Sequence, residues 1–199
     1  MLKALKQKRR NRRLQQLIDS NSLELWPKVA AELEADHLHE ALSGEFCALE
    51  LCIQRGHHQL LQQLLQRFPE LLQRPLHDGT QLAQKVLTLE SPLRLLSALL
   101  SAGLNPNTAF NGKSLVELCL AHPPEQAMLL INRLAQHGAS LDRPELLQQA
   151  MRLRNQPLIK FMVDSGAPLE TSDESVYDAE MLAFTRRCVE DKKIRDMWV

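Results

Sequence analysis

Aromatic residues are scarce in this sequence, making up 4% of its 199 residues. The strands of sandwiches and barrels are rich in aromatic and β-branched residues, whereas leucine dominates this chain, so the composition favours helices. The chain also lacks an excess of charge of either sign, since 24 Lys and Arg balance 24 Asp and Glu. The protein as a whole therefore exerts no net electrostatic attraction on nucleic acids or membranes.

The cysteines lack the C-x-x-C spacing of zinc and redox sites. The four are Cys47, Cys52, Cys119 and Cys188. We expect them to be reduced, and we expect most of them to fill small spaces on apolar helix faces. No apolar run approaches the ~20 residues of a membrane-spanning helix. The charged N-terminal residues are not followed by the apolar stretch of a secretory signal. These features predict a cytoplasmic protein.

Catalytic patterns are also missing. The sequence has no G-x-S-x-G segment, no glycine-rich phosphate loop and no pair of histidines four residues apart on a helix. His37 and His39 are near neighbours, but two residues on a helix place them about 200° apart around its axis. We therefore predict no catalytic, cofactor-binding or metal-binding residues, and we expect a protein that is not an enzyme.

A unit of turn, helix, loop, helix and glycine is present, and it is clearest in residues 77–107. Asp78-Gly79 favours a tight turn because glycine tolerates positive φ. Two short leucine-rich helices are expected after this turn, and Ser91-Pro92 marks the start of the second. That helix should end at Gly103, where a left-handed capping residue belongs.

The same unit recurs along the chain. Gly112 follows Gly79 by 33 residues, and Gly138 follows Gly103 by 35. All 7 glycines fall at turn, inter-helix or helix-end positions of one register. Such a period is typical of helical repeat arrays. The sequence therefore predicts paired helices stacked in order, with no sheet beyond the turn tips.

Several segments match one family pattern: Ile53-Gln54-Arg55-Gly56-His57, Leu95-Leu96 with Leu99-Leu100 and Gly103, and Leu158-Ile159 with Met162-Val163 and Gly166-Ala167. At these segments, over residues 43–170, the chain resembles the ankyrin repeat family. The Thr-Pro-Leu-His segment of that family is replaced here, for example by Ser114-Leu115-Val116-Glu117. The resemblance implies an all-α, ankyrin-like solenoid of about four repeats. It also implies a concave binding surface formed by the first helices and the turn tips.

The domain boundaries follow from these units. We predict a basic N-terminal helix and capping region at 1–42, ankyrin-like repeats at 43–170, and an acidic linker with a C-terminal capping helix at 171–199. The expected repeats are 43–74, 75–108, 109–141 and 142–170. Residues 121–125 are expected to form a loop inserted between the two helices of the third repeat. Trp198 is expected to pack back on the array, and the alternative is that it forms a tail for a partner.

The expected function is non-catalytic binding of a partner protein through the concave face, by a chain that is more often a monomer than a homo-oligomer. The candidate contact residues are His77, Asp78, Thr80, Phe110, Asn111, Lys113 and Glu117. Phe110 either packs beneath the neighbouring turn or serves as an aromatic anchor. A rigid surface of this kind loses little conformational entropy when a partner binds.

The N-terminal arm is strongly basic, and its candidate contact residues are Lys6, Lys8, Arg9, Arg10, Arg12 and Arg13. One interpretation is an arm that docks on nucleic acid or an anionic membrane. The other is a solvated capping helix. An enzyme with a diffuse site is a third and weaker alternative. Dependence of affinity on salt distinguishes the arm from the concave face, because phosphate contacts weaken steeply as salt rises.

Overall fold

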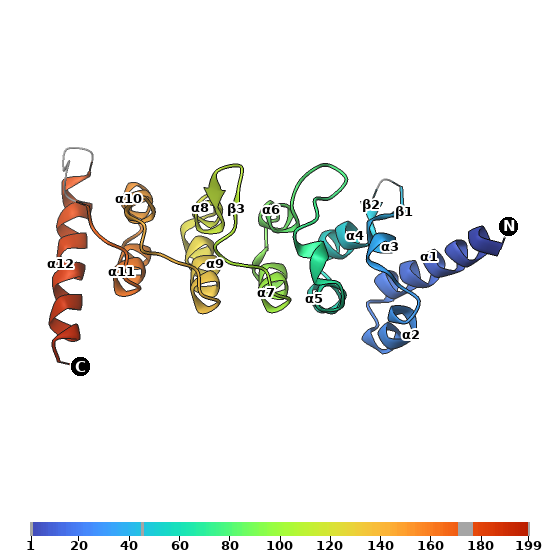
Figure 1. The fold of residues 1–199 in the computed structure, drawn as a ribbon. Helices are drawn as coiled ribbons and strands as arrows, with labels where there is room; N and C mark the ends of the chain where they lie inside the picture. Colours follow the sequence, from blue (N-terminus) through green and yellow to red (C-terminus); the bar gives the residue numbers. More distant parts are fainter. Residues whose placement is uncertain (1, 45, 171–176, 199) are drawn as a thin grey trace. The chain divides into compact units, whose positions relative to one another are not determined.

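The computed structural model describes residues 2–44, 46–170 and 177–198. It confirms the all-α prediction, since 64% of the chain is helical. The chain divides into two compact units, Met1–Asn105 and Pro106–Val199, and each is built largely from pairs of consecutive helices (Figure 1). Strands in the described residues are confined to two short hairpins.

The N-terminal unit begins with a long helix and continues through short helices and one hairpin. Its elements are α1 (Leu2–Ser20), the 3₁₀ helix η1 (Leu23–Leu25), α2 (Trp26–Ala30), α3 (Ala35–His39), β1 (Ala41–Ser43), β2 (Phe46–Cys47), α4 (Ala48–Gln54), α5 (His58–Arg67), the 3₁₀ helix η2 (Pro69–Leu72), α6 (Leu82–Leu87) and α7 (Leu93–Ser101).

Apolar side chains hold this unit together. Helix α1 packs against α2 and α4, and it buries Leu14, Leu17 and Ile18 completely. Helix α4 pairs with α5, and α6 pairs with α7. The two pairs join where α5 contacts α7 (Figure 1), and Leu64 on α5 and Leu99 on α7 are fully buried.

The C-terminal unit has one hairpin and five helices among its described residues. Its elements are β3 (Ala109–Phe110), β4 (Lys113–Ser114), α8 (Leu115–Leu120), α9 (Pro124–Gln136), α10 (Pro144–Arg152), α11 (Gln156–Asp164) and α12 (Ala179–Asp196).

The helices of this unit also pack as consecutive pairs. Helix α8 contacts α9 and α10 contacts α11, while α8 also contacts α10 and α9 contacts α11 (Figure 1). The last helix, α12, lies against α11. It buries Met181, Leu182, Thr185 and Cys188 on that side. Most of the predicted acidic linker, residues 171–176, lies outside the described residues, and Asp178 and Glu180 form ion pairs with Arg154.

The first helices of three pairs begin with the same capping arrangement. The side chain at the third helical position accepts a hydrogen bond from the backbone N–H of the residue before the helix. The bonds are Cys47 to Glu50 at 2.9 Å, Gln81 to Gln84 at 3.2 Å, and Ser114 to Glu117 at 2.7 Å. Helices of six or seven residues leave a large share of their backbone groups unpaired, so these bonds determine where each helix starts.

The predicted glycine register agrees with the backbone, because all 7 glycines have positive φ. Gly103 illustrates the reason. At φ 106° it ends α7, and the following N–H of Leu104 donates back to the carbonyl of Leu99 at 3.0 Å. An L-residue rarely adopts this conformation, so a glycine at this position ends the helix without strain.

Two details of the sequence interpretation were wrong. The predicted loop at 121–125 covers only residues 121–123, because α9 begins at Pro124 and its 13 residues contain the rest of the extra length of this pair. A proline at the first helical position favours such a start. Trp198 does not pack back, since its side chain is 86% exposed. Met197 beside it is 75% exposed, whereas Arg195 on the last turn of α12 pairs with Asp164 of α11.

Truncating a leucine at the junction of the two N-terminal pairs should be costly. We expect Leu99→Ala to lower the free energy of unfolding by about 2–5 kcal/mol, because it leaves a cavity between α5 and α7. Urea denaturation followed by circular dichroism measures this loss. The matched control is Leu5→Ala, since Leu5 is 61% exposed and its truncation should change the free energy by less than about 0.5 kcal/mol. Equal losses for the two variants would contradict the packing described here.

Candidate functional site

Three of the predicted contact residues, His77, Asp78 and Thr80, lie in one turn of the N-terminal unit. This turn and the β1–β2 hairpin border an open hollow of about 430 Å³, which we name the turn-tip hollow. It is lined by Ala41, Phe46, Glu50, His77, Asp78 and Lys85.

The turn beside this hollow is held by its own hydrogen bonds. The N–H of Leu76 donates to the carbonyl of Thr80 at 2.8 Å, and the N–H of Gly79 donates to the carbonyl of Leu76 at 2.9 Å. The carboxylate of Asp78 accepts from both the N–H and the hydroxyl of Thr80, at 2.9 and 2.5 Å. Thr80 therefore orients Asp78, and the turn is shaped before any partner arrives.

An ion pair crosses one side of the hollow. Lys85 Nζ lies 2.8 Å from the second carboxylate oxygen of Asp78. Hydrogen bonds from Lys85 and then Thr80 hold the pKa of Asp78 well below its ordinary value, and the same contact raises the pKa of Lys85. Both groups stay charged at neutral pH. An exposed pair contributes little stability, so its main effect is to fix the two charges in place.

The hairpin side of the hollow was not predicted from the sequence. Phe46 is 42% exposed at the start of β2, while Glu50 is buried and caps α4. The Cys47-x-x-Glu50 spacing could have located this helix start and the residues beside it. An exposed phenylalanine next to a fixed charge pair combines an apolar and a charged surface, as many protein interfaces do.

His77 also contacts a buried histidine at the end of α3. The rings of His39 and His77 lie edge to face, with centroids 6.5 Å apart. His39 is buried, and its Nε2 has no hydrogen-bond partner among the described residues. Burial lowers the pKa of His39, and the charges of Arg74 and His77 lower it further, against the opposing effects of Glu50 and Asp36. A neutral imidazole therefore joins α3 to the turn.

The other four predicted contact residues belong to the C-terminal unit. Phe110 pairs with Lys113 across the β3–β4 hairpin, whose loop residues Asn111 and Gly112 both have positive φ. Such a two-residue loop matches the twist of the strands. Asn111 and Lys113 are exposed, while Phe110 is half-buried, so its ring is partly available at the tip.

Glu117 is occupied by the fold to a greater degree. It accepts hydrogen bonds from the N–H and hydroxyl of Ser114, both at 2.7 Å, and Arg143 lies 3.3 Å away. Burial acts to raise the pKa of Glu117, but these donors outweigh it and the pKa is lowered. Its principal visible role is to cap α8.

The predicted basic residues of α1 separate into two groups. Arg10 binds Glu40 at 2.7 Å and Arg13 binds Glu32, so these two help attach α1 to the unit. Lys6, Lys8, Arg9 and Arg12 are exposed and form no ion pair within the described ranges. One run of basic residues thus contains both residues that attach α1 to the unit and residues whose charge is exposed without an ion pair in the described ranges.

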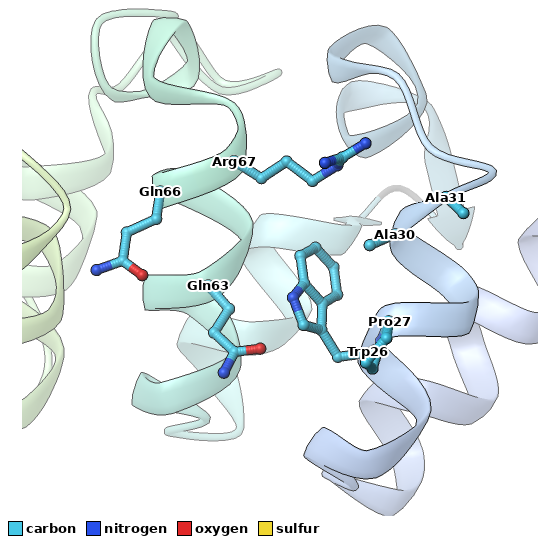
Figure 2. Close-up of a pocket in the computed structure, with 7 residues that line it drawn as sticks. All are labelled: Trp26, Pro27, Ala30, Ala31, Gln63, Gln66 and Arg67. Carbon is cyan, nitrogen blue, oxygen red and sulfur yellow. The ribbon is translucent and has the colours of Figure 1, made fainter.

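A second hollow of about 650 Å³ lies in the N-terminal unit between α2 and α5, and it is lined by Trp26, Pro27, Ala30, Ala31, Gln63, Gln66 and Arg67. Figure 2 shows the indole of Trp26 on α2 facing the side chain of Gln63 on α5. The Gln63 Oε1 is buried and accepts no hydrogen bond in the part of the chain described. The second hollow therefore offers the aromatic face of Trp26.

The cysteine thiols have low reactivity, because the fold buries them. All four cysteines are buried and unbonded, and burial raises the pKa of Cys47 to about 11 and of Cys52 to about 12. Such thiols are protonated and unreactive at neutral pH. No three His, Cys, Asp or Glu side chains among the described residues form a group that could hold a metal ion.

Comparison with protein-family models, with curated proteins and with solved structures found no match for this chain. Among the helices described, none is long and apolar enough to cross a membrane.

The buried histidine predicts how stability changes with pH. The unfolded chain, in which His39 has its ordinary pKa of 6.5, binds more protons than the folded chain below that pH. The stabilisation is therefore complete above about pH 6.5 and is lost as the pH falls toward the lowered folded-state pKa. We expect the free energy of unfolding, measured in urea at pH 7.5 and 5.5, to decrease less in His39→Gln than in the parent protein.

His57 provides the control, because burial lowers its pKa as well. His57→Gln should remove a separate part of the pH dependence, and the double variant should remove both parts. A full pH dependence in His39→Gln would show that His39 is not responsible.

Proposed function

We propose that this chain is a non-catalytic protein-binding module, an ankyrin-like solenoid of about four helix pairs that binds a partner through its turn tips and first helices. The preorganised turn-tip hollow carries this proposal. It combines an exposed aromatic ring with a fixed pair of opposite charges, and its backbone is held by local hydrogen bonds. Little conformational entropy is lost when a partner docks on such a surface.

The repeated local structure supports the solenoid part of the proposal. Three first helices share one capping arrangement, second helices contact second helices within each unit, and the glycines share one register. Helices α1 and α12 would serve as the terminal caps that arrays of this kind require. The resemblance to ankyrin repeats then relates the turn tips to the partner-binding face.

The thiols support the remaining parts. Unbonded cysteines are typical of a reducing compartment, which agrees with a cytoplasmic location. Their raised pKa values make them poor nucleophiles, which agrees with a non-catalytic role. The partner is a protein of unknown identity, and the chain would act as a monomer.

The test is site-specific photocrosslinking in native lysate. A photoreactive phenylalanine analogue at position 46 or 110 should capture the same partner, because both positions lie at turn tips. The analogue at position 129, where Leu129 is 55% exposed on α9, is the control and should not capture it. The captured protein is then purified for titration calorimetry.

In that titration, we expect Phe46→Ala with Lys85→Ala to weaken binding at least tenfold at both low and high salt, since aromatic anchors dominate interface energies. Trp26→Ala alters the second hollow and is the matched control, so it should leave the affinity unchanged. Loss of binding in Trp26→Ala with no loss in the turn-tip variant would contradict the proposed surface.

A further inference from the structure

Helix α1 carries a strip of cations that the fold leaves unpaired. We name Lys6, Lys8, Arg9 and Arg12 the basic strip. All four are exposed, and none forms an ion pair with a described residue. No acidic residue precedes Asp19 in the chain, so the strip has no counter-charge on its own part of the helix.

The acidic residues around α1 do not neutralise the strip, because each contacts another group. Glu40 accepts from Arg10 and Gln7, Glu32 pairs with Arg13, and Asp19 pairs with Arg55 and accepts from Gln15. The positive charge of the strip is therefore available to an external anion, although the net charge of the chain is zero.

The strip is also held in place. Leu14, Leu17 and Ile18 on the opposite side of α1 are fully buried, and α1 contacts α2 and α4. The cations thus project from a helix that belongs to the folded unit. A partner does not need to order this helix on binding, which lowers the entropic cost of association.

The positions around the helix axis point to the shape of the partner. At about 100° per residue, Leu5, Arg12 and Gln16 form the middle of the exposed side. Lys8 lies about 60° to one side of Leu5, while Arg9 and Lys6 lie about 40° and 100° to the other. Cations therefore flank both sides of the exposed face.

We propose that the basic strip docks in the major groove of double-stranded DNA, with the flanking cations on the two phosphate walls. The major groove of B-form DNA is about 12 Å wide and admits an α-helix. Arg and Gln at the middle of the face can donate to base edges or phosphates. This contact uses a surface separate from the turn-tip hollow, and it goes beyond the proposed binding of a protein.

Two other anionic partners fit the strip less well. A helix at a bilayer surface has an apolar face, whereas the middle of this face contains one leucine beside Arg12 and Gln16. Single-stranded nucleic acid is bound by stacking on aromatic rings, and α1 has no aromatic residue. Binding to the phosphates of a duplex requires only cationic side chains, and the strip supplies these.

The test is fluorescence anisotropy of the full chain with a labelled 20-base-pair DNA duplex. Four phosphate contacts predict a slope of about −3.6 for log affinity against log salt, which is a loss of about 100-fold between 50 and 200 mM. Replacing all four strip residues by Gln should reduce affinity at 50 mM salt by at least tenfold and flatten the slope. The melting temperature should not change, because these side chains are exposed and form no ion pair with a described residue.

The matched control removes four exposed cations elsewhere: Arg94→Gln, Arg152→Gln, Arg187→Gln and Lys193→Gln. It should bind the duplex as the parent protein does. If the fourfold strip variant does not fold, Arg12→Glu alone should weaken binding to the duplex. It should not make the dependence of log affinity on log salt steeper.

Three competing probes are run in parallel: an RNA duplex of the same sequence, the single DNA strand, and phosphatidylcholine vesicles with 30% phosphatidylserine. Tighter binding to the DNA duplex than to each of these supports the proposal, since the A-form major groove is too narrow for a helix. Tighter binding to RNA, to the single strand or to vesicles would overturn it, and so would an equal loss in the control variant.

Discussion

Short helices that cannot stand alone are the main constraint on this structure. The first helices α4, α6 and α8 have six or seven residues, whereas isolated helices below about 12–15 residues are marginal in water. Each must gain its stability from burial of leucines against neighbouring helices. Within each unit, the contacts are therefore mainly between consecutive helices and between equivalent helices of adjacent pairs.

The same constraint decides which polar residues are free to act. A short helix needs its first N–H groups satisfied, so Glu50, Gln84 and Glu117 turn back onto the chain as caps. What remains at the turn tips is a smaller set, including Phe46, Lys113 and the fixed pair of Asp78 with Lys85. The fold thus separates carboxylates that stabilise helix starts from groups that can meet a partner, although both kinds lie within a few residues of each other.

The parts that could be predicted from sequence are those governed by local backbone rules. Gly103 ends α7 because of its own φ, and Asp78-Gly79 forms a turn because of its own side chain and conformational freedom. The exposure of Trp198 and the hollow beside Phe46 depend on which distant side chains arrive nearby, and no spacing in the sequence contains that information. Pro124 is an intermediate case, because a proline fits both a loop and the first position of a helix. The sequence does not distinguish the two, and the packing of α9 against α8 and α11 favours the helix.

Helix α1 shows how a single run of like charge acquires two roles. Arg9 and Arg10 are adjacent in sequence, yet a rotation of about 100° places one in solvent and the other beside Glu40. Arg12 and Arg13 differ in the same way, because Arg13 meets Glu32. The outward cations follow the periodicity of the helix, so their number depends on which side of α1 the leucines bury. A change in the apolar positions Leu14, Leu17 and Ile18 would therefore alter the electrostatic surface without altering a single charge.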